Sequence, residues 1–253
     1  MHNAQGYANS ILQANQNLSK QSPTLSLGQS QKLKKALQDD ALGAIYSGIT
    51  SIADATQAIN NGFYSWATIK LYYSVFYFAR SIIALETDTA ILYSGTHPCS
   101  WQCKPGLSPI ARKGTTHKVV LNMFTTLLPN HFLLSQQIDM KTPFDWMKDL
   151  REEINYRTPK FQEPDVPEHF KFIAKYSTRK TLSAYASDDQ HLYTFDKDHA
   201  ILAFPLSALK STFDSLSNAK LEIDKDDVNY LISTFSDKHG PIPEIASLLR
   251  KRK

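Results

Sequence analysis

The chain has 253 residues, of which 42% are apolar and 21% are charged, and its formal net charge is +4. These values exclude a wholly disordered chain, a collagen-like repeat and a small disulfide scaffold, and they predict a globular protein with a real core. The best candidate for a membrane span, residues 71–85, is shorter than the roughly 18 apolar residues required and contains Arg80. We therefore expect no membrane association. Two cysteines and an N-terminus without a basic region and apolar run predict a cytoplasmic protein.

The first 60 residues change from a polar segment to a helical pattern. Residues 1–30 are rich in Asn, Gln and Ser, which predicts a loosely ordered arm with at most one short helix, or a segment that folds on contact with a partner. From 31 to 60, apolar residues recur at steps of three and four, and this spacing predicts one amphipathic helix. The run Asn60-Asn61-Gly62 predicts its end.

The segment from 63 to 86 predicts a second helix that is apolar and aromatic on most sides. A helix that is apolar nearly all round lies at the centre of a fold. We therefore expect Trp66, Tyr73 and Phe76 to be mostly buried.

Two further helices complete a first unit. Residues 87–113 contain several glycines and prolines and predict a long connection. Thr115 and Thr116 can cap a third helix, and a fourth is expected over 144–156. The chain from 31 to 160 is therefore predicted to be an all-α, antiparallel up-and-down helical bundle.

The C-terminal part, 168–253, predicts a small, mostly helical region with a basic tail. A weak alternation over 191–195 predicts a short strand, and helices are expected over 200–216, 224–235 and 244–250. The tail can attract nucleic-acid phosphates, although four charges at a chain end are also typical of a solvated terminus. It consists of Arg250, Lys251, Arg252 and Lys253.

Four polar or aromatic residues of the second helix are spaced by three, four and three, so they share one helix face. They are Lys70, Tyr73, Tyr77 and Arg80. Cations on an otherwise apolar helix need partners, because burying an unpaired charge is unfavourable. One interpretation is a row of ion pairs with the fourth helix, which carries Asp145, Asp149, Glu152 and Glu153. The other is a phosphate or nucleotide site completed by Arg151, with the tyrosines stacking on a base.

Two other groups of residues were considered as sites. Arg151 and Asn155 are one helical turn apart, so an arginine fork and an amide could hold a phosphate together. His97, Cys99 and Cys103 lie close in sequence, but their spacing is not a common zinc pattern and no fourth ligand is evident. We interpret the cysteines as free thiols and expect neither a metal nor a cofactor.

Three segments resemble the HEPN family, and they come in the family's order over about residues 40–160. They are Trp66-Ala-Thr-Ile-Lys70-Leu-Tyr72-Tyr73-Ser-Val-Phe76-Tyr-Phe-Ala79-Arg80, then Thr116-His117-Lys118-Val119-Val120, and Leu150-Arg151-Glu-Glu-Ile-Asn155-Tyr156-Arg157. The resemblance implies a helical bundle, a homodimer or a larger complex, and either metal-independent ribonuclease activity or RNA or nucleotide binding. It places Arg151, Asn155, Tyr156 and His117 as the candidate catalytic residues.

The sequence departs from the nuclease members of that family, in which a histidine follows the arginine by four to six residues. Tyr156 and Arg157 occupy the corresponding span here, and the Arg112–His117 pair lies at the wrong helix. The favoured hypothesis is therefore a non-catalytic, HEPN-like RNA- or nucleotide-binding subunit of a bacterial antiviral defence or toxin–antitoxin assembly. The alternatives are a metal-independent HEPN ribonuclease that uses His117, and a purely structural helical adaptor. The missing histidine favours binding over cleavage.

Overall fold

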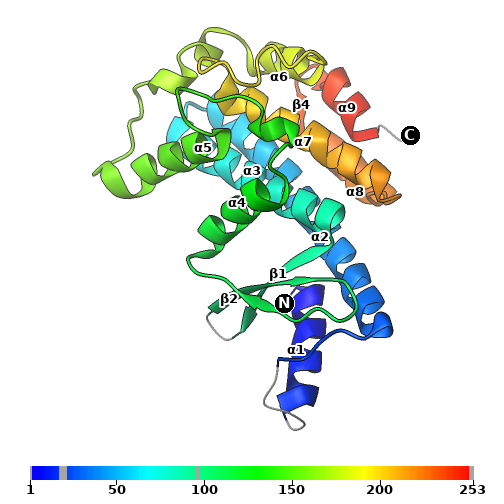
Figure 1. The fold of residues 1–253 in the computed structure, drawn as a ribbon. Coiled ribbons are helices and arrows are strands. Elements are labelled where there is room, and N and C mark those ends of the chain that lie inside the picture. Colours follow the sequence, from blue (N-terminus) through cyan, green and yellow to red (C-terminus); the bar gives the residue numbers. More distant parts are fainter. Residues whose placement is uncertain (1, 17–21, 95–96, 251–253) are drawn as a thin grey trace. The chain divides into compact units, whose positions relative to one another are not determined.

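A computed structural model describes residues 2–16, 22–94 and 97–250. Most of the described residues are helical, and the predicted all-α class is confirmed (Figure 1). Within these ranges no helix combines the length and apolar character needed to cross a bilayer. The contacts group the chain into two units, which we describe separately. Unit 1 comprises Met1–Ala44 and Ala79–Pro129, and unit 2 comprises Ile45–Phe78 and Asn130–Lys253.

Most helices lie close to where the sequence predicts them, and α6 is one that the sequence analysis did not predict. Their bounds are α1 Asn3–Gln16, α2 Leu27–Asn60, α3 Tyr64–Thr87, α4 Thr116–Leu127, α5 Pro143–Glu152, α6 Thr178–Ala186, α7 Ala200–Asn218, α8 Lys225–Thr234 and α9 Pro243–Arg250. The unit boundaries fall inside α2 and α3, and the C-terminal region belongs to unit 2 together with the turn between these helices. The sequence-based division into 1–30, 31–160 and 168–253 stays a prediction.

In unit 1, the helix α1 lies within the N-terminal segment for which the sequence allowed one short helix. The carboxylate of Asp40 on α2 accepts the backbone N–H groups of Asn3 and Ala4, at 2.8 and 2.9 Å, and so caps α1 from another helix. The side-chain amide of Gln5 exchanges two hydrogen bonds with the backbone of Tyr93, at 2.9 and 2.6 Å. This exchange satisfies the open edge of the strand beside which α1 lies (Figure 1).

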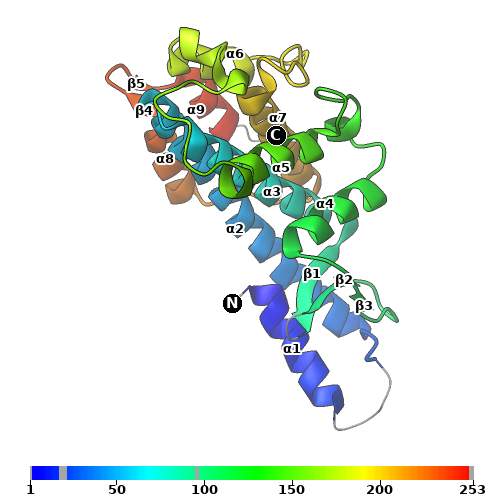
Figure 2. The same ribbon diagram turned by 90° about the vertical axis from the view of Figure 1, so that its left-hand side faces the viewer.

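The expected long connection over 87–113 is wrong, because most of it forms a small antiparallel sheet in unit 1 (Figure 2). Its strands, in the order β1-β2-β3, are Thr89–Ser94, His97–Gln102 and Ile110–Ala111. Trp101 of β2 lies opposite Ala90, is completely buried and donates its indole N–H to the carbonyl oxygen of Leu107 at 2.9 Å. The β-branched and aromatic residues of this segment therefore favour strands despite its glycines and prolines.

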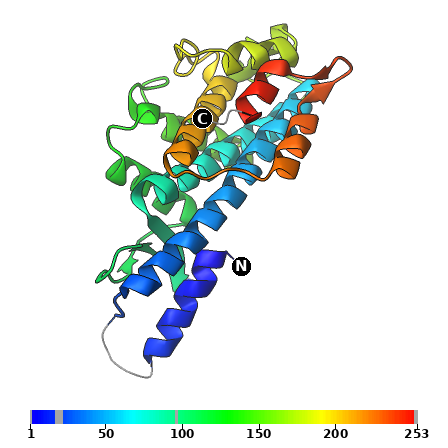
Figure 3. The same cartoon turned by 90° about the vertical axis from the view of Figure 1, so that its right-hand side faces the viewer.

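In unit 2, the end of α2 and the start of α3 form an antiparallel helical hairpin (Figure 3). Gly62 takes a positive φ of 74°, and the backbone N–H of Phe63 bonds to the carbonyl oxygen of Ala58 at 2.8 Å, which ends α2 where the sequence predicted. Gly48 of α2 faces the buried ring of Phe78 on α3. The absence of a side chain at Gly48 allows this close approach of the two helices.

Helices α6 to α9 contact one another in unit 2, and residues from this region bond to the hairpin. The Thr178 hydroxyl, in the first turn of α6, donates to the side-chain oxygen of Asn60. Arg179 holds the short hairpin of β4, Ser236–Asp237, and β5, Gly240–Pro241, through the Asp237 carboxylate and two backbone carbonyls. The predicted strand over 191–195 is wrong, because His191 takes a left-handed φ of 56° and the following residues form turns.

The prediction that α3 is buried on all sides is wrong along one stripe. Phe76 is buried as expected, but Trp66 is 50% exposed and Tyr73 is partly exposed. Trp66 instead makes an edge-on contact with the ring of Phe161, whose centroid lies 5.3 Å away. Aromatic character alone therefore predicted burial at positions that the fold leaves at the surface.

Replacing Gly43 and Gly48 of α2 by alanine should change the free energy of unfolding in opposite directions. A Cβ at position 48 would lie 2.5 Å from Cε1 of Phe78, whose ring has no room to move. We expect Gly48→Ala to destabilise the protein by about 1–3 kcal/mol through overpacking. At position 43 no atom lies within 4 Å of the added Cβ, so Gly43→Ala should stabilise the exposed helix by about 0.5–1 kcal/mol. Urea unfolding measures both, and equal effects would contradict the close contact.

Stability should fall in acid because of His169. Its Nε2 lies 3.0 Å from the hydroxyl of Thr68, and burial, only weakly opposed by Glu168, lowers its pKa to about 4. Since the unfolded chain binds this proton near pH 6.5, stability should be full above that pH and drop by about 2–3 kcal/mol as the pH falls to about 4. Urea unfolding across this range should show His169→Gln to be less acid-sensitive than the wild type. The exposed His239, replaced by Gln, is the control.

Candidate functional site

The candidate site is a cluster around Arg151 in unit 2. Its guanidinium carbon lies 5.3 Å from the ring centroid of Tyr72, 5.9 Å from that of Tyr73 and 5.6 Å from that of Tyr156. All three distances are within the range of cation–π attraction. Two of the tyrosines come from α3 and the third follows α5. We call these four residues the Arg151 cluster.

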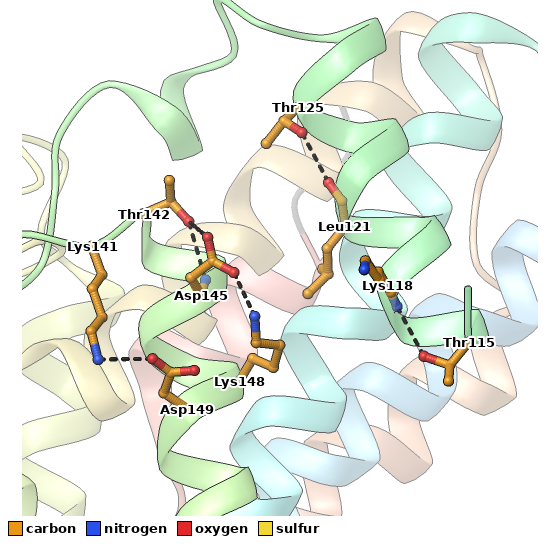
Figure 4. A network of polar contacts seen from close by, with 9 residues as sticks. All are labelled: Thr115, Lys118, Leu121, Thr125, Lys141, Thr142, Asp145, Lys148 and Asp149. Carbon is orange, nitrogen blue, oxygen red and sulfur yellow. Dashed lines mark hydrogen bonds and ion pairs between the residues drawn. The ribbon is translucent and has the colours of Figure 1, made fainter. Parts of the chain in front are cut away.

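Local sequence explains why Arg151 stands where it does. The hydroxyl of Thr142 accepts the N–H of Asp145 and caps α5, and Pro143 occupies the first turn, where its missing N–H does no harm (Figure 4). Arg151 comes in the last turn of α5, where the helix dipole favours a cation. Both signals depend only on neighbouring residues, so the sequence alone carries them.

A widened helical turn then brings Tyr156 to the arginine. Residues Glu153–Arg157 form a π-helical turn that ends where the N–H of Thr158 bonds to the carbonyl oxygen of Glu153, at 3.0 Å. In such a turn the hydrogen bond spans five residues, so a side chain five positions after Arg151 can share its face. Tyr156 is 74% exposed while its ring contacts Arg151. Asn155, which regular helical spacing predicted beside Arg151, is an exposed residue of this turn.

The residues around Arg151 keep its guanidinium positively charged. No ion pair with a carboxylate is found for Arg151 within the described part of the chain, and its Nε is buried without a hydrogen-bond partner. Burial alone would lower the pKa of Arg151, but the hydrogen bond with Tyr73 and the three tyrosines raise it overall. Burial also raises the pKa of Tyr72, against the pull of the neighbouring arginine. The cluster therefore offers a cation beside neutral phenols.

The expected row of ion pairs between the second and fourth helices is wrong for Lys70. Its ammonium pairs with Asp54 of α2, at 2.5 Å. On and beside α5, the carboxylates bind local lysines: Asp145 pairs with Lys148 at 2.7 Å and Asp149 with Lys141 at 2.8 Å (Figure 4). Both ion pairs join residues that are close in sequence. Asp145 and Asp149 therefore pair with lysines on or beside α5 and not with α3.

Tyr77 belongs to the same face of α3 as the rest of the predicted group. The ring of Tyr73 lies between those of Tyr72 and Tyr77, at 5.6 and 6.3 Å. Lys70, Tyr73 and Tyr77 are all partly exposed. The structure therefore brings the tyrosines of the predicted group into one aromatic row with Arg151.

Two other predicted residues belong to unit 1. Arg80 lines a small cavity there with His2 and Asp40, and it contributes, after burial, to the lowered pKa of His2. His117 is half-buried in the first turn of α4, which Thr115 caps by accepting the N–H of Lys118 (Figure 4). Arg151 belongs to unit 2, so a common catalytic site of His117 and Arg151 stays a prediction.

The remaining residues that the sequence singled out are those of the basic tail and Arg112. Arg250 ends α9, and Lys251, Arg252 and Lys253 lie outside the described residues. Arg112 donates its Nε–H to the hydroxyl of Ser100 at 2.8 Å.

Unit 2 also contains a polar cavity of about 320 Å³ that sequence reasoning missed. Its lining includes Phe132, His191, Asp214 and Lys210. The Lys210 ammonium is held by the carbonyl oxygens of two residues, at 3.2 and 2.8 Å, and is 4.0 Å from a carboxylate. Because this cation is already satisfied by the protein, the cavity is a weaker anion site than the Arg151 cluster.

Sequence reasoning also missed one member of the Arg151 cluster, the buried Tyr72. Adjacent residues of a helix point to different sides, so Tyr72 and Tyr73 direct their rings differently. That signal could have placed one phenol of the pair toward α5.

Comparisons with known proteins add no relative: no family model, no curated protein and no solved structure matches this chain.

The two cysteines of unit 1 should be unreactive while the protein is folded. Cys99 and Cys103 are buried, and burial raises both pKa values, that of Cys103 to about 12. Because the thiolate is the reactive form, iodoacetamide at mildly alkaline pH should label neither thiol in the native protein and both in urea. Mass spectrometry counts the labels. Rapid labelling of the native protein would contradict this burial.

Proposed function

We propose that the protein is a HEPN-like RNA- or nucleotide-binding subunit of a bacterial antiviral defence or toxin–antitoxin assembly, acting in the cytoplasm as a homodimer or within a larger complex. The observation that carries the proposal is the Arg151 cluster. An arginine that is held by three aromatic rings, and by no carboxylate of the described residues, keeps its full charge for a ligand. The exposed ring of Tyr156 adds a surface on which a base can stack.

The geometry suits a phosphate better than a protein carboxylate. A guanidinium binds phosphate oxygens through two parallel N–H groups, and its plane can stack on a phenol at the same time. Tyr72 and Tyr73 fix the guanidinium from the α3 side, which reduces the conformational entropy lost on binding. The proposal therefore assigns the anion contact to Arg151 and the base contact to Tyr156.

Binding is favoured over cleavage by the residues that accompany Arg151. Ribonucleases without a metal need a general base near the scissile phosphate, and a phenol serves this role poorly at neutral pH. The side chains that contact Arg151 are tyrosines, and burial raises the pKa of Tyr72. The ribonuclease alternative depends on His117 reaching this cluster, within one chain or between two.

Arg151→Lys tests the proposal because it keeps the charge and removes the planar fork. We expect it to weaken RNA binding about tenfold or more, since hydrogen bonds to a charged group contribute about 1.5–3 kcal/mol. The matched control is Arg157→Lys in the same segment, whose side chain is exposed and pairs with Glu153 at 3.7 Å. That control should change affinity less than twofold. Fluorescence anisotropy with a labelled RNA, at about 50 and 200 mM salt, measures both, and affinity should fall with salt.

Three results would contradict the proposal in different ways. Equal loss in both variants would indicate a general basic attraction without a site. No binding of any RNA or nucleotide by the wild type would favour the structural adaptor. Cleavage of total RNA in the presence of EDTA, abolished by Arg151→Lys, would establish the ribonuclease alternative.

A further inference from the structure

The exposed stripe of α3 carries three aromatic side chains and one cationic side chain. Trp66, Lys70, Tyr73 and Tyr77 are separated by four, three and four residues, so they follow one line along the helix. All four are exposed or partly exposed, whereas the intervening Leu71, Val75 and Phe76 are buried. We call these four residues the α3 stripe.

Neighbouring elements add two rings and a second cation to this stripe. The ring of Phe161 meets Trp66 edge-on, with 5.3 Å between centroids. The guanidinium of Arg151 lies over Tyr73, and the same group contacts the exposed Tyr156. Rings and cations therefore lie side by side on this surface. All of these residues belong to unit 2.

The charge of the stripe is suited to a polyanion. The single acidic residue of α3, Glu86, lies outside the part of the helix that carries the stripe. Two acidic residues lie beside the stripe. The carboxylate of Glu163 accepts the N–H and the hydroxyl of Ser65, next to Trp66. Asp54 pairs with Lys70 at 2.5 Å between two exposed side chains. Exposed pairs of this kind contribute little to stability, so a phosphate can replace the carboxylate.

We propose that the α3 stripe binds single-stranded nucleic acid, with bases stacked on Trp66, Tyr73 and Tyr77 and phosphates bound by Lys70 and Arg151. This inference rests on the proposed function and names its ligand class. Aromatic rings interleaved with cations are the arrangement by which proteins bind single strands without reading their sequence. A duplex hides the faces of its bases from such rings.

The length of the stripe sets the length of strand it covers. Trp66 and Tyr77 are eleven residues apart, which corresponds to about 17 Å along an α-helix. At about 3.4 Å per stacked nucleotide, this distance holds about five nucleotides, and about three where protein rings separate the bases. A free mononucleotide contacts one ring and one cation of the stripe, so it should bind weakly.

The test uses the full chain and fluorescein-labelled oligouridylates, from the mononucleotide to the octamer. Affinity should rise with length and level off at about three to five nucleotides. Trp66→Ala should weaken octamer binding about tenfold, and Trp66→Phe should restore most of it, because stacking needs a ring. Tyr230→Ala on α8, which removes another exposed ring, is the control and should have no effect.

Intrinsic fluorescence gives a second readout at the same residue. Trp66 is 50% exposed, whereas Trp101 and Trp146 are 0% and 6% exposed. Quenching by the octamer therefore reports on Trp66, and it should be absent when the octamer is replaced by a stable RNA duplex. Circular dichroism of each variant checks that the fold is retained.

Each failure has its own signature. An octamer that binds the wild type but is insensitive to Trp66→Ala, or that binds no better than the mononucleotide or the duplex, would overturn the α3 stripe and leave the Arg151 site standing. No binding of any of these ligands would overturn both. A dimer that dissociates on Trp66→Ala would show that the stripe contacts a second copy of the chain, and would also overturn the inference.

Discussion

The candidate site depends on one constraint, the enclosure of α3 on every side except a single stripe. Phe76 and Phe78 are directed into the protein, and the close approach at Gly48 leaves no freedom to rotate the helix about its axis. Rotation by one residue would bury Lys70 and expose Leu71. The core of unit 2 thus determines which side chains of α3 remain available for a ligand.

The kind of side chain that holds Arg151 determines whether its charge is available to a ligand. A carboxylate would orient the guanidinium but cancel its charge, and a ligand phosphate would then have to displace it. Tyrosine rings orient the group through its plane and leave the charge in place, at about 0.5–2 kcal/mol for each ring. The widened turn before Thr158 completes this arrangement by bringing Tyr156 to the same side.

Much of the helical framework was predictable because its signals are local. Thr115 caps α4, Asp224 caps α8 and Gly62 ends the turn after α2, each as the sequence indicates. The sheet of unit 1 was missed because the glycines and prolines of that segment indicate a loop locally, while strand pairing depends on residues up to a strand away. The contacts of α1 could not be predicted for the same reason: Asp40 and Tyr93, which hold it, are remote in sequence.

The sequence by itself determined the helix periods, their caps and the presence of cations among aromatics on one face of α3, because these depend on spacings of a few residues. Only the tertiary structure decided that Lys70 pairs with Asp54, that Arg151 is held by phenols and that Trp66 stays at the surface. Each outcome is a choice among several partners of similar local chemistry. Such choices follow from which helices approach one another, and that approach is set by the packing of the whole core.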